Sequence, residues 1–147
     1  MTSQSNAPGS ADEPDHPVRR VVEAYYATVA DLGSTPESLA ALLADDVRIT
    51  EHPNLITPRG GRRDKAATLT GFGAGKQLLS AQSFDVHEVL VRGERAAVRA
   101  TWRGTIGIDA GPLRAGTELV AHVASFLTVR DGLVVEHETF DCYEPFA

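Results

Sequence analysis

The fold is decided by residues 118–142, which read ELVAHVASFLTVRDGLVVEHETFDC. Two runs of mostly alternating apolar and polar residues flank the pair Asp131-Gly132. An Asp-Gly pair between two strand patterns is typical of a tight β-hairpin. The pattern therefore predicts one strand from Glu118 to Val129 and a return strand from Leu133 to Cys142.

The predicted hairpin places a histidine opposite a carboxylate. If Asp131 and Gly132 are the two central turn residues, His122 faces Asp141, and Phe126 faces His137. An aspartate beside a histidine fixes its tautomer and raises its basicity, which suits a general base. We therefore expect His122 and Asp141 to be catalytic. The alternative is a structural ion pair, because an inward carboxylate needs a partner.

Length and composition favour one globular domain. The chain has 147 residues and a net charge of −6, and this charge argues against a nucleic-acid partner. Residues 1–16 are rich in Ser, Asp, Pro and Ala and predict a disordered tail before a single domain at 17–147. No apolar run is long enough to span a membrane, and the N-terminus lacks the pattern of a secretory signal. We expect a cytoplasmic protein without an internal disulfide, since Cys142 is the single cysteine.

The rest of the chain predicts helices followed by antiparallel strands. Apolar spacing and capping patterns predict helices over residues 17–33, 34–46 and 64–80. Further strands are predicted at 47–50, 83–91 and 96–106, with a loop at 51–63. Helices first and then an antiparallel meander indicate an α+β fold. A curved sheet wrapped over about three helices would enclose a cone-shaped, apolar cavity.

Several short motifs carry a family resemblance. The chain resembles the SnoaL-like branch of the NTF2-like superfamily, which includes ketosteroid isomerase, limonene-epoxide hydrolase and polyketide cyclases. The motifs are Ala24-Tyr25-Tyr26-Ala27, Asp31-Leu32-Gly33, Leu43-Ala44-Asp45-Asp46-Val47, Glu51-His52-Pro53, Trp102-Arg103-Gly104-Thr105 and Val129-Arg130-Asp131-Gly132-Leu133-Val134. The resemblance covers roughly residues 17 to 147 and implies an NTF2-like cone.

The resemblance also implies roles for single residues. The oxyanion-hole tyrosine of ketosteroid isomerase falls on Tyr26, whose phenol would donate to a substrate oxygen. Its proton-shuttling carboxylate falls on His52, or on the adjacent Glu51, which we otherwise expect to be solvated. Its second oxyanion-hole acid falls on Ala124, which can donate nothing. A cavity-lining aromatic position falls on Asp141.

The resemblance implies a small cofactor-independent enzyme acting on an apolar, carbonyl- or polyene-bearing molecule, as a polyketide or natural-product cyclase or isomerase. His122, Asp141, Tyr26 and His52 would be catalytic. The expected substrate-binding residues are Trp102, Phe72, Phe126, Thr139 and His137. We expect neither a metal nor a cofactor, because the histidines lack a recognised ligand spacing.

Two other functions stay open. The same pocket would serve a non-catalytic small-molecule-binding or dimerisation module. Water addition, as in epoxide hydrolysis, would need a water held by Asp141 and a neighbour such as His122. The face of the return strand opposite the pocket carries Val134, Phe140 and Cys142, and such an apolar outer face predicts a homodimer.

Overall fold

The computed structural model describes residues 15–146, so most of the predicted N-terminal tail lies outside the described part of the chain. Within these residues the elements are α1 (Pro17–Ala30), α2 (Pro36–Ala40), β1 (Leu43–Glu51), β2 (Gly61–Arg63), α3 (Lys65–Leu78), β3 (Leu79–Arg92), β4 (Arg95–Ile106), β5 (Glu118–Arg130) and β6 (Leu133–Tyr143). None of the helices among these residues is long and apolar enough to cross a membrane.

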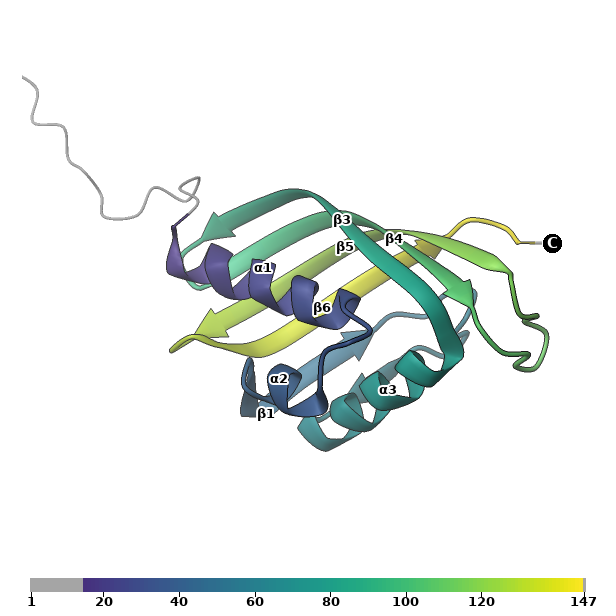
Figure 1. Ribbon diagram of the computed structural model, residues 1–147. Helices are drawn as coiled ribbons and strands as arrows, with labels where there is room; N and C mark the ends of the chain where they lie inside the picture. The colour runs from purple at the N-terminus through teal and green to yellow at the C-terminus, as the bar shows by residue number, and fades with distance from the viewer. Residues whose placement is uncertain (1–14, 147) are drawn as a thin grey trace, which may run out of the picture.

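The strands form one curved sheet in the order β2-β1-β6-β5-β4-β3. All neighbours are antiparallel except β1 and β6, which run parallel. Helix α1 lies across the concave face of the sheet, and α2 and α3 lie below it (Figure 1). The α+β prediction is confirmed.

The helices begin at the caps that their sequences offer. The Nδ1 atom of His16, rather than Asp15, accepts a hydrogen bond from the Val18 amide and caps α1. Thr35 caps α2, but this helix is shorter than predicted, since the chain enters β1 at Leu43. Burial of Leu43 and Val47 in the core favours the strand there.

Helix α1 anchors the core. Its buried residues are Val18, Val22, Tyr25 and Tyr26, which pack on apolar side chains of the concave sheet face. Leu127 and Val134 on that face are fully buried. Burying an aliphatic side chain of this size contributes about 1.5–3 kcal/mol, so this layer fixes α1 on the sheet.

The turn of the last hairpin is as predicted, but its register is not. Asp131 and Gly132 have φ angles of 54° and 77°, as a two-residue hairpin turn requires. Val129 then pairs with Val134, whereas Thr128 pairs with Glu136, so Val135 is an extra residue. This β-bulge shifts the following pairs by one residue and exchanges the two faces of the predicted pairing.

The predicted His122–Asp141 pair is therefore wrong. Val123 lies opposite Asp141, and His122 lies opposite Cys142 on the outer face. The His122 Nε2 atom lies 2.7 Å from the Glu144 carboxylate, and its side chain is 60 % exposed. Val134, predicted on the outer face, is fully buried because it precedes the bulge.

The outer face of the sheet carries an aromatic patch, formed by His52, Phe126 and Phe140. The His52 ring stacks on Phe140 with 4.2 Å between centroids, and Phe126 meets Phe140 edge-on at 6.2 Å. Phe126 is 42 % exposed and Phe140 is 39 % exposed. The predictions that Phe126 lines the cavity and that His52 serves it are wrong, because both residues alternate outward.

Candidate active site

The concave side of the sheet encloses two adjoining pockets. The first has a volume of about 280 Å³ and is lined by residues that include Tyr25, Arg63, Phe72, His137 and Thr139. The second has a volume of about 160 Å³ and is lined by residues that include Phe84, Trp102, Asp141 and Tyr143. Val29 of α1 lines both pockets, so they lie on either side of this residue.

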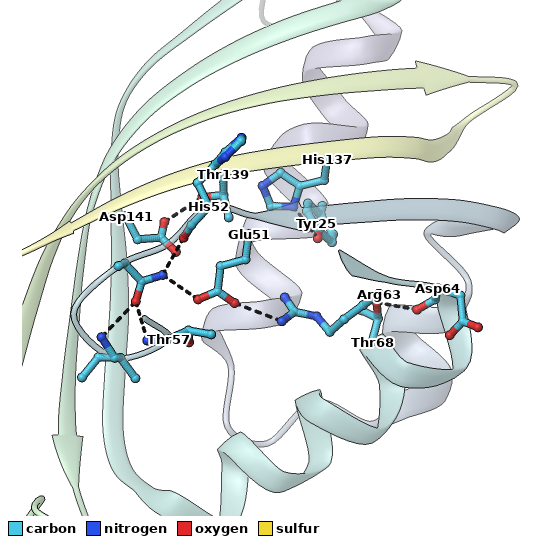
Figure 2. A network of polar contacts seen from close by, with 12 residues as sticks. Tyr25, Glu51, His52, Thr57, Arg63, Asp64, Thr68, His137, Thr139 and Asp141 are labelled. Atoms are coloured by element: carbon cyan, nitrogen blue, oxygen red, sulfur yellow. Dashed lines mark hydrogen bonds and ion pairs between the residues drawn. The ribbon is translucent and has the colours of Figure 1, made fainter. Parts of the chain in front are cut away.

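A run of hydrogen bonds joins the two pockets along β5 and β6. The Tyr25 hydroxyl lies 2.9 Å from His137 Nδ1, and His137 Nε2 lies 3.1 Å from Ser125 Oγ. Ser125 donates to Thr139 Oγ1 at 3.0 Å, and Thr139 donates to Asp141 Oδ1 at 2.7 Å. Figure 2 shows Tyr25 and His137 at one end of this run, and Thr139 and Asp141 at the other.

Burial keeps His137 neutral. Loss of hydration, with a smaller contribution from the positive charge of Arg63, lowers the pKa of the imidazole from 6.5 to about 4. At neutral pH the ring therefore carries one proton and has one donor and one acceptor nitrogen. Such a ring can pass a proton between its two neighbours without gaining a net charge.

Asp141 is a carboxylate with an unusual affinity for protons. Burial raises its pKa, the hydrogen bond from Thr139 opposes this rise, and the negative charge of Glu51 adds to it. A carboxylate with a raised pKa inside an apolar pocket is a candidate general base.

A second carboxylate lies inside the cone, where the sequence predicted a solvated residue. Arg63 donates to Glu51 Oε1 at 3.0 Å, and Asn54 donates to Glu51 Oε2 at 2.8 Å (Figure 2). Burial alone would raise the pKa of Glu51, but the hydrogen bonds from Asn54, Arg63 and Thr57 outweigh it and hold the pKa below its usual range. Glu51 is therefore ionised, and it contributes a fixed negative charge beside Asp141.

The hydroxyl of Tyr26 is buried and makes no hydrogen bond with any residue of 15–146. Burial raises the pKa of this phenol to about 12; the nearby Ser125 hydroxyl lowers it in part, and the charge of Asp141 raises it. The ring of Tyr26 packs edge-on against Phe84, a wall of the second pocket, at 5.1 Å between centroids. A buried donor without a partner costs about 1–3 kcal/mol, so its presence beside the cavity calls for an explanation.

The structure brings together most of the predicted site residues and separates the rest. Those on the inner side of the cone are Asp141, Tyr26, Trp102, Phe72, Thr139 and His137. Those on the outer face are His122, His52 and Phe126. Trp102 is held by a hydrogen bond from its Nε1 to Gln82 Oε1 at 2.9 Å, and the end of its indole lies against Gly104.

Three inner residues were missed from the sequence, namely Tyr25, Arg63 and Ser125, and a fourth, Glu51, was named only as an alternative to His52 and expected to be solvated. Glu51 follows Val47 and Ile49 at alternate positions, so period-two spacing alone places it on their face. Arg63 lies directly opposite Ile49 in β2, a strand hidden in the predicted loop. The bulge at Val135 concealed Ser125, because the regular register turned it outward.

The comparisons with known proteins agree with this architecture. A family model described as a SnoaL-like domain matches residues 22–137. The chain belongs to the SnoaL-like family. Its fold is that of the NTF2-like superfamily. A search among curated proteins found no match to this SnoaL-like chain.

Solved structures share the fold at low sequence identity. IdmH from Streptomyces antibioticus, a proposed polyketide cyclase, is 24 % identical, with 84 % of this chain and 91 % of that chain covered and a TM-score of 0.69. A proposed polyketide cyclase from Acidithiobacillus ferrooxidans is 14 % identical, with 88 % and 90 % covered and a TM-score of 0.70. An LEH-like epoxide hydrolase from M. tuberculosis is 18 % identical, with 87 % and 83 % covered and a TM-score of 0.60.

Proposed function

We propose that this SnoaL-like protein is a cofactor-independent cyclase or isomerase acting on a largely apolar small molecule that bears a carbonyl group. Asp141 is the general base that accepts the proton lost from beside the carbonyl, and the phenol of Tyr26 stabilises the oxygen that becomes negative. Phe72, Phe84 and Trp102 provide apolar walls that hold the carbon skeleton in a reactive shape. His122 and His52 have no part in this proposal.

The observation that carries the proposal is the position of Asp141. It is a carboxylate with a raised pKa, it lines an apolar pocket, and its one hydrogen bond to a described residue comes from Thr139. A structural carboxylate would be expected to have a basic partner, as Glu51 has in Arg63. The cyclase names of two structures with the same fold, and the family itself, support this class of reaction.

The proposal is tested with a small-molecule extract of the source cells. Wild-type protein, Asp141→Asn and His122→Ala are each incubated with the extract, and the mixtures are followed by mass spectrometry. We expect wild type and His122→Ala to transform the same compound and Asp141→Asn to spare it. A compound that is bound by all three proteins but never transformed would instead support a binding module without chemistry.

Water addition is a second candidate, because an arginine lies inside the cone. Arg63 faces the first pocket, and it is paired with Glu51, whose charge also reaches Asp141. In this reaction Asp141 activates a water for attack on an epoxide, and the charges of Arg63 and Glu51 set the proton affinity of Asp141. The same experiment separates the two reactions, since isomerisation keeps the mass of the substrate and hydrolysis of an epoxide adds one water.

Tyr26→Phe is expected to raise stability and reduce turnover together. Removing a buried hydroxyl without a partner should raise the free energy of unfolding by about 1 kcal/mol. Turnover should fall, because the phenol would no longer be available to the developing oxyanion. Thermal unfolding and the rate of substrate loss measure the two effects. A loss of stability in this variant would mean that the hydroxyl has a structural partner and no catalytic role.

We also propose that a second copy of the chain covers the aromatic patch on the outer sheet face. Phe126 and Phe140 form a contiguous exposed pair on this face, and an open groove of about 520 Å³ adjoins Phe140. Sedimentation equilibrium should give a dimer for wild type and a monomer for Phe140→Arg. Ile108→Arg, which changes an exposed apolar residue outside the sheet, should remain a dimer. A monomeric wild type would contradict this proposal.

A further inference from the structure

The hydrogen bonds between the two pockets all point in one direction. Thr139 donates its single hydroxyl proton to Asp141, and Ser125 donates its single proton to Thr139. Ser125 can therefore only accept from His137, so the imidazole proton is on Nε2. Because the ring is neutral, Nδ1 is an acceptor, and Tyr25 must donate to it.

We propose that Tyr25, His137, Ser125, Thr139 and Asp141 form a proton relay that carries a proton from a substrate held beside Tyr25 in the first pocket to the carboxylate of Asp141 in the second. The nature of the substrate rests on the proposed function, whereas the direction of the relay is a property of the five side chains alone. Tyr25 would contact the substrate, and the three inner groups would act through it and through Asp141.

Each step of the relay breaks one bond to hydrogen and forms another. A substrate C–H or O–H proton binds the Tyr25 oxygen as the Tyr25 proton moves to His137 Nδ1. The Nε2 proton moves to Ser125, the Ser125 proton to Thr139, and the Thr139 proton to Asp141 Oδ1. The substrate becomes an anion, Asp141 becomes a neutral acid, and the groups between them end as neutral as they began. Asp141 can then return the proton to a different atom of the same substrate.

The relay groups are shielded from water, which keeps the proton on this path. Relative exposure is 5 % for Tyr25, 9 % for His137, 1 % for Ser125 and 8 % for Thr139. A relay open to solvent would exchange its protons with water at every member. A buried one exchanges them only at its ends, in the two pockets.

The charged and titratable surroundings favour a proton arriving at Asp141. His137 faces Tyr25 and Tyr26 of α1, and Arg63 disfavours a second proton on its ring. Asp141 faces Tyr26 of α1 and Tyr143 of its own strand. Glu51 of β1 favours its protonation, and Arg63 opposes it. Arg63 is paired with Glu51, so its positive charge is largely neutralised. The proton therefore reaches a carboxylate that has no cationic partner.

The relay makes a prediction that needs no substrate. When Asp141 is protonated on Oδ1, it can donate a hydrogen bond to the Thr139 hydroxyl, whereas Oδ2 makes no hydrogen bond with residues 15–146. The proton is therefore expected on Oδ1. Protonation of Asp141 should therefore reverse the whole run and leave the imidazole proton on Nδ1. Nitrogen-15 shifts of His137 distinguish the Nε2–H form, the Nδ1–H form and the doubly protonated ring, and the carboxyl carbon shift reports Asp141.

We expect His137 to be in the Nε2–H form at neutral pH and to show the Nδ1–H form as Asp141 becomes protonated. Thr139→Ser keeps the hydroxyl and should behave like wild type. Thr139→Val removes it, so the tautomer should no longer follow Asp141. Ser125→Ala interrupts the run at a different member and should give the same result if Thr139→Val folds poorly. An Nδ1–H ring at neutral pH, or a tautomer that responds alike in Thr139→Ser and Thr139→Val, would overturn the relay. Either result leaves the extract experiment unaffected, because the relay is read here without turnover.

Discussion

Asp141→Asn is expected to lower turnover by about 10²–10⁴-fold, the usual contribution of a general base. The amide has nearly the shape of the carboxylate, and its oxygen can still accept the hydrogen bond from Thr139, so the loss should come from chemistry. Substrate turnover by purified wild type and variant at saturating concentration measures it. In wild type the rate should also fall with decreasing pH as Asp141 is protonated, at a pH above the usual range of an aspartate.

The stability of Asp141→Asn separates catalysis from structure. The pKa of Asp141 is raised by folding, so its ionised form costs stability at neutral pH, and that cost disappears as the pH falls through the raised pKa. The variant should therefore be at least as stable as wild type at neutral pH. Glu138→Gln is the matched control, because Glu138 lies on the outer face of the same strand. Equal turnover loss in both variants, or unfolding of Asp141→Asn, would contradict a catalytic role.

The second large effect is a loss of stability in mild acid caused by His137. Folding lowers the pKa of this imidazole from 6.5 to about 4. Between these pH values the unfolded chain binds more protons than the folded chain. The contribution of His137 to the free energy of unfolding is therefore fully present above pH 6.5 and is lost as the pH falls. The decrease should reach roughly 2 kcal/mol at pH 5, since one pKa unit corresponds to about 1.4 kcal/mol. Denaturant unfolding at several pH values measures it.

Two variants assign this pH dependence to one residue. His137→Gln keeps a donor and an acceptor for Ser125 and Tyr25 but does not titrate, so its stability should change little between pH 6.5 and 5. His122→Ala removes an exposed histidine and should keep the wild-type slope. Asp141, whose pKa is raised by folding, acts in the opposite direction in both proteins, so the difference in stability between wild type and His137→Gln isolates the histidine. A difference in stability between wild type and His137→Gln that stays constant across this window would rule out a buried, neutral His137.

The sequence predicted those parts of the fold that depend on local patterns. The Asp131-Gly132 turn, the strands beside it and the helix–strand order follow from spacing and turn chemistry. Register does not, because one extra residue at Val135 exchanges the faces beyond it. The adjacent valines Val134 and Val135 break the alternation and were the visible sign of a bulge.

The site was predicted less completely because it depends on that register and on a distant loop. Asp141, Thr139 and His137 were placed correctly on one face together, but their predicted partner was on the wrong side of the neighbouring strand. Arg63 reaches the cavity through a three-residue strand that has no apolar pattern of its own. Its position is fixed by pairing with β1, which is a tertiary contact.

Strand β6 is made last of the described strands and lies between β1 and β5, in the interior of the sheet. During synthesis, β1 paired with β2 and the meander of β3 to β5 therefore remain two unconnected parts of the sheet until β6 is made. Each part has an unpaired edge strand until then. The segment that joins them also carries His137, Thr139 and Asp141. A chain interrupted before Leu133 would have neither a continuous sheet nor the candidate site, and the exposed edges of β1 and β5 would be open to pairing with other chains. The joining of the sheet and the assembly of the candidate site thus depend on one segment.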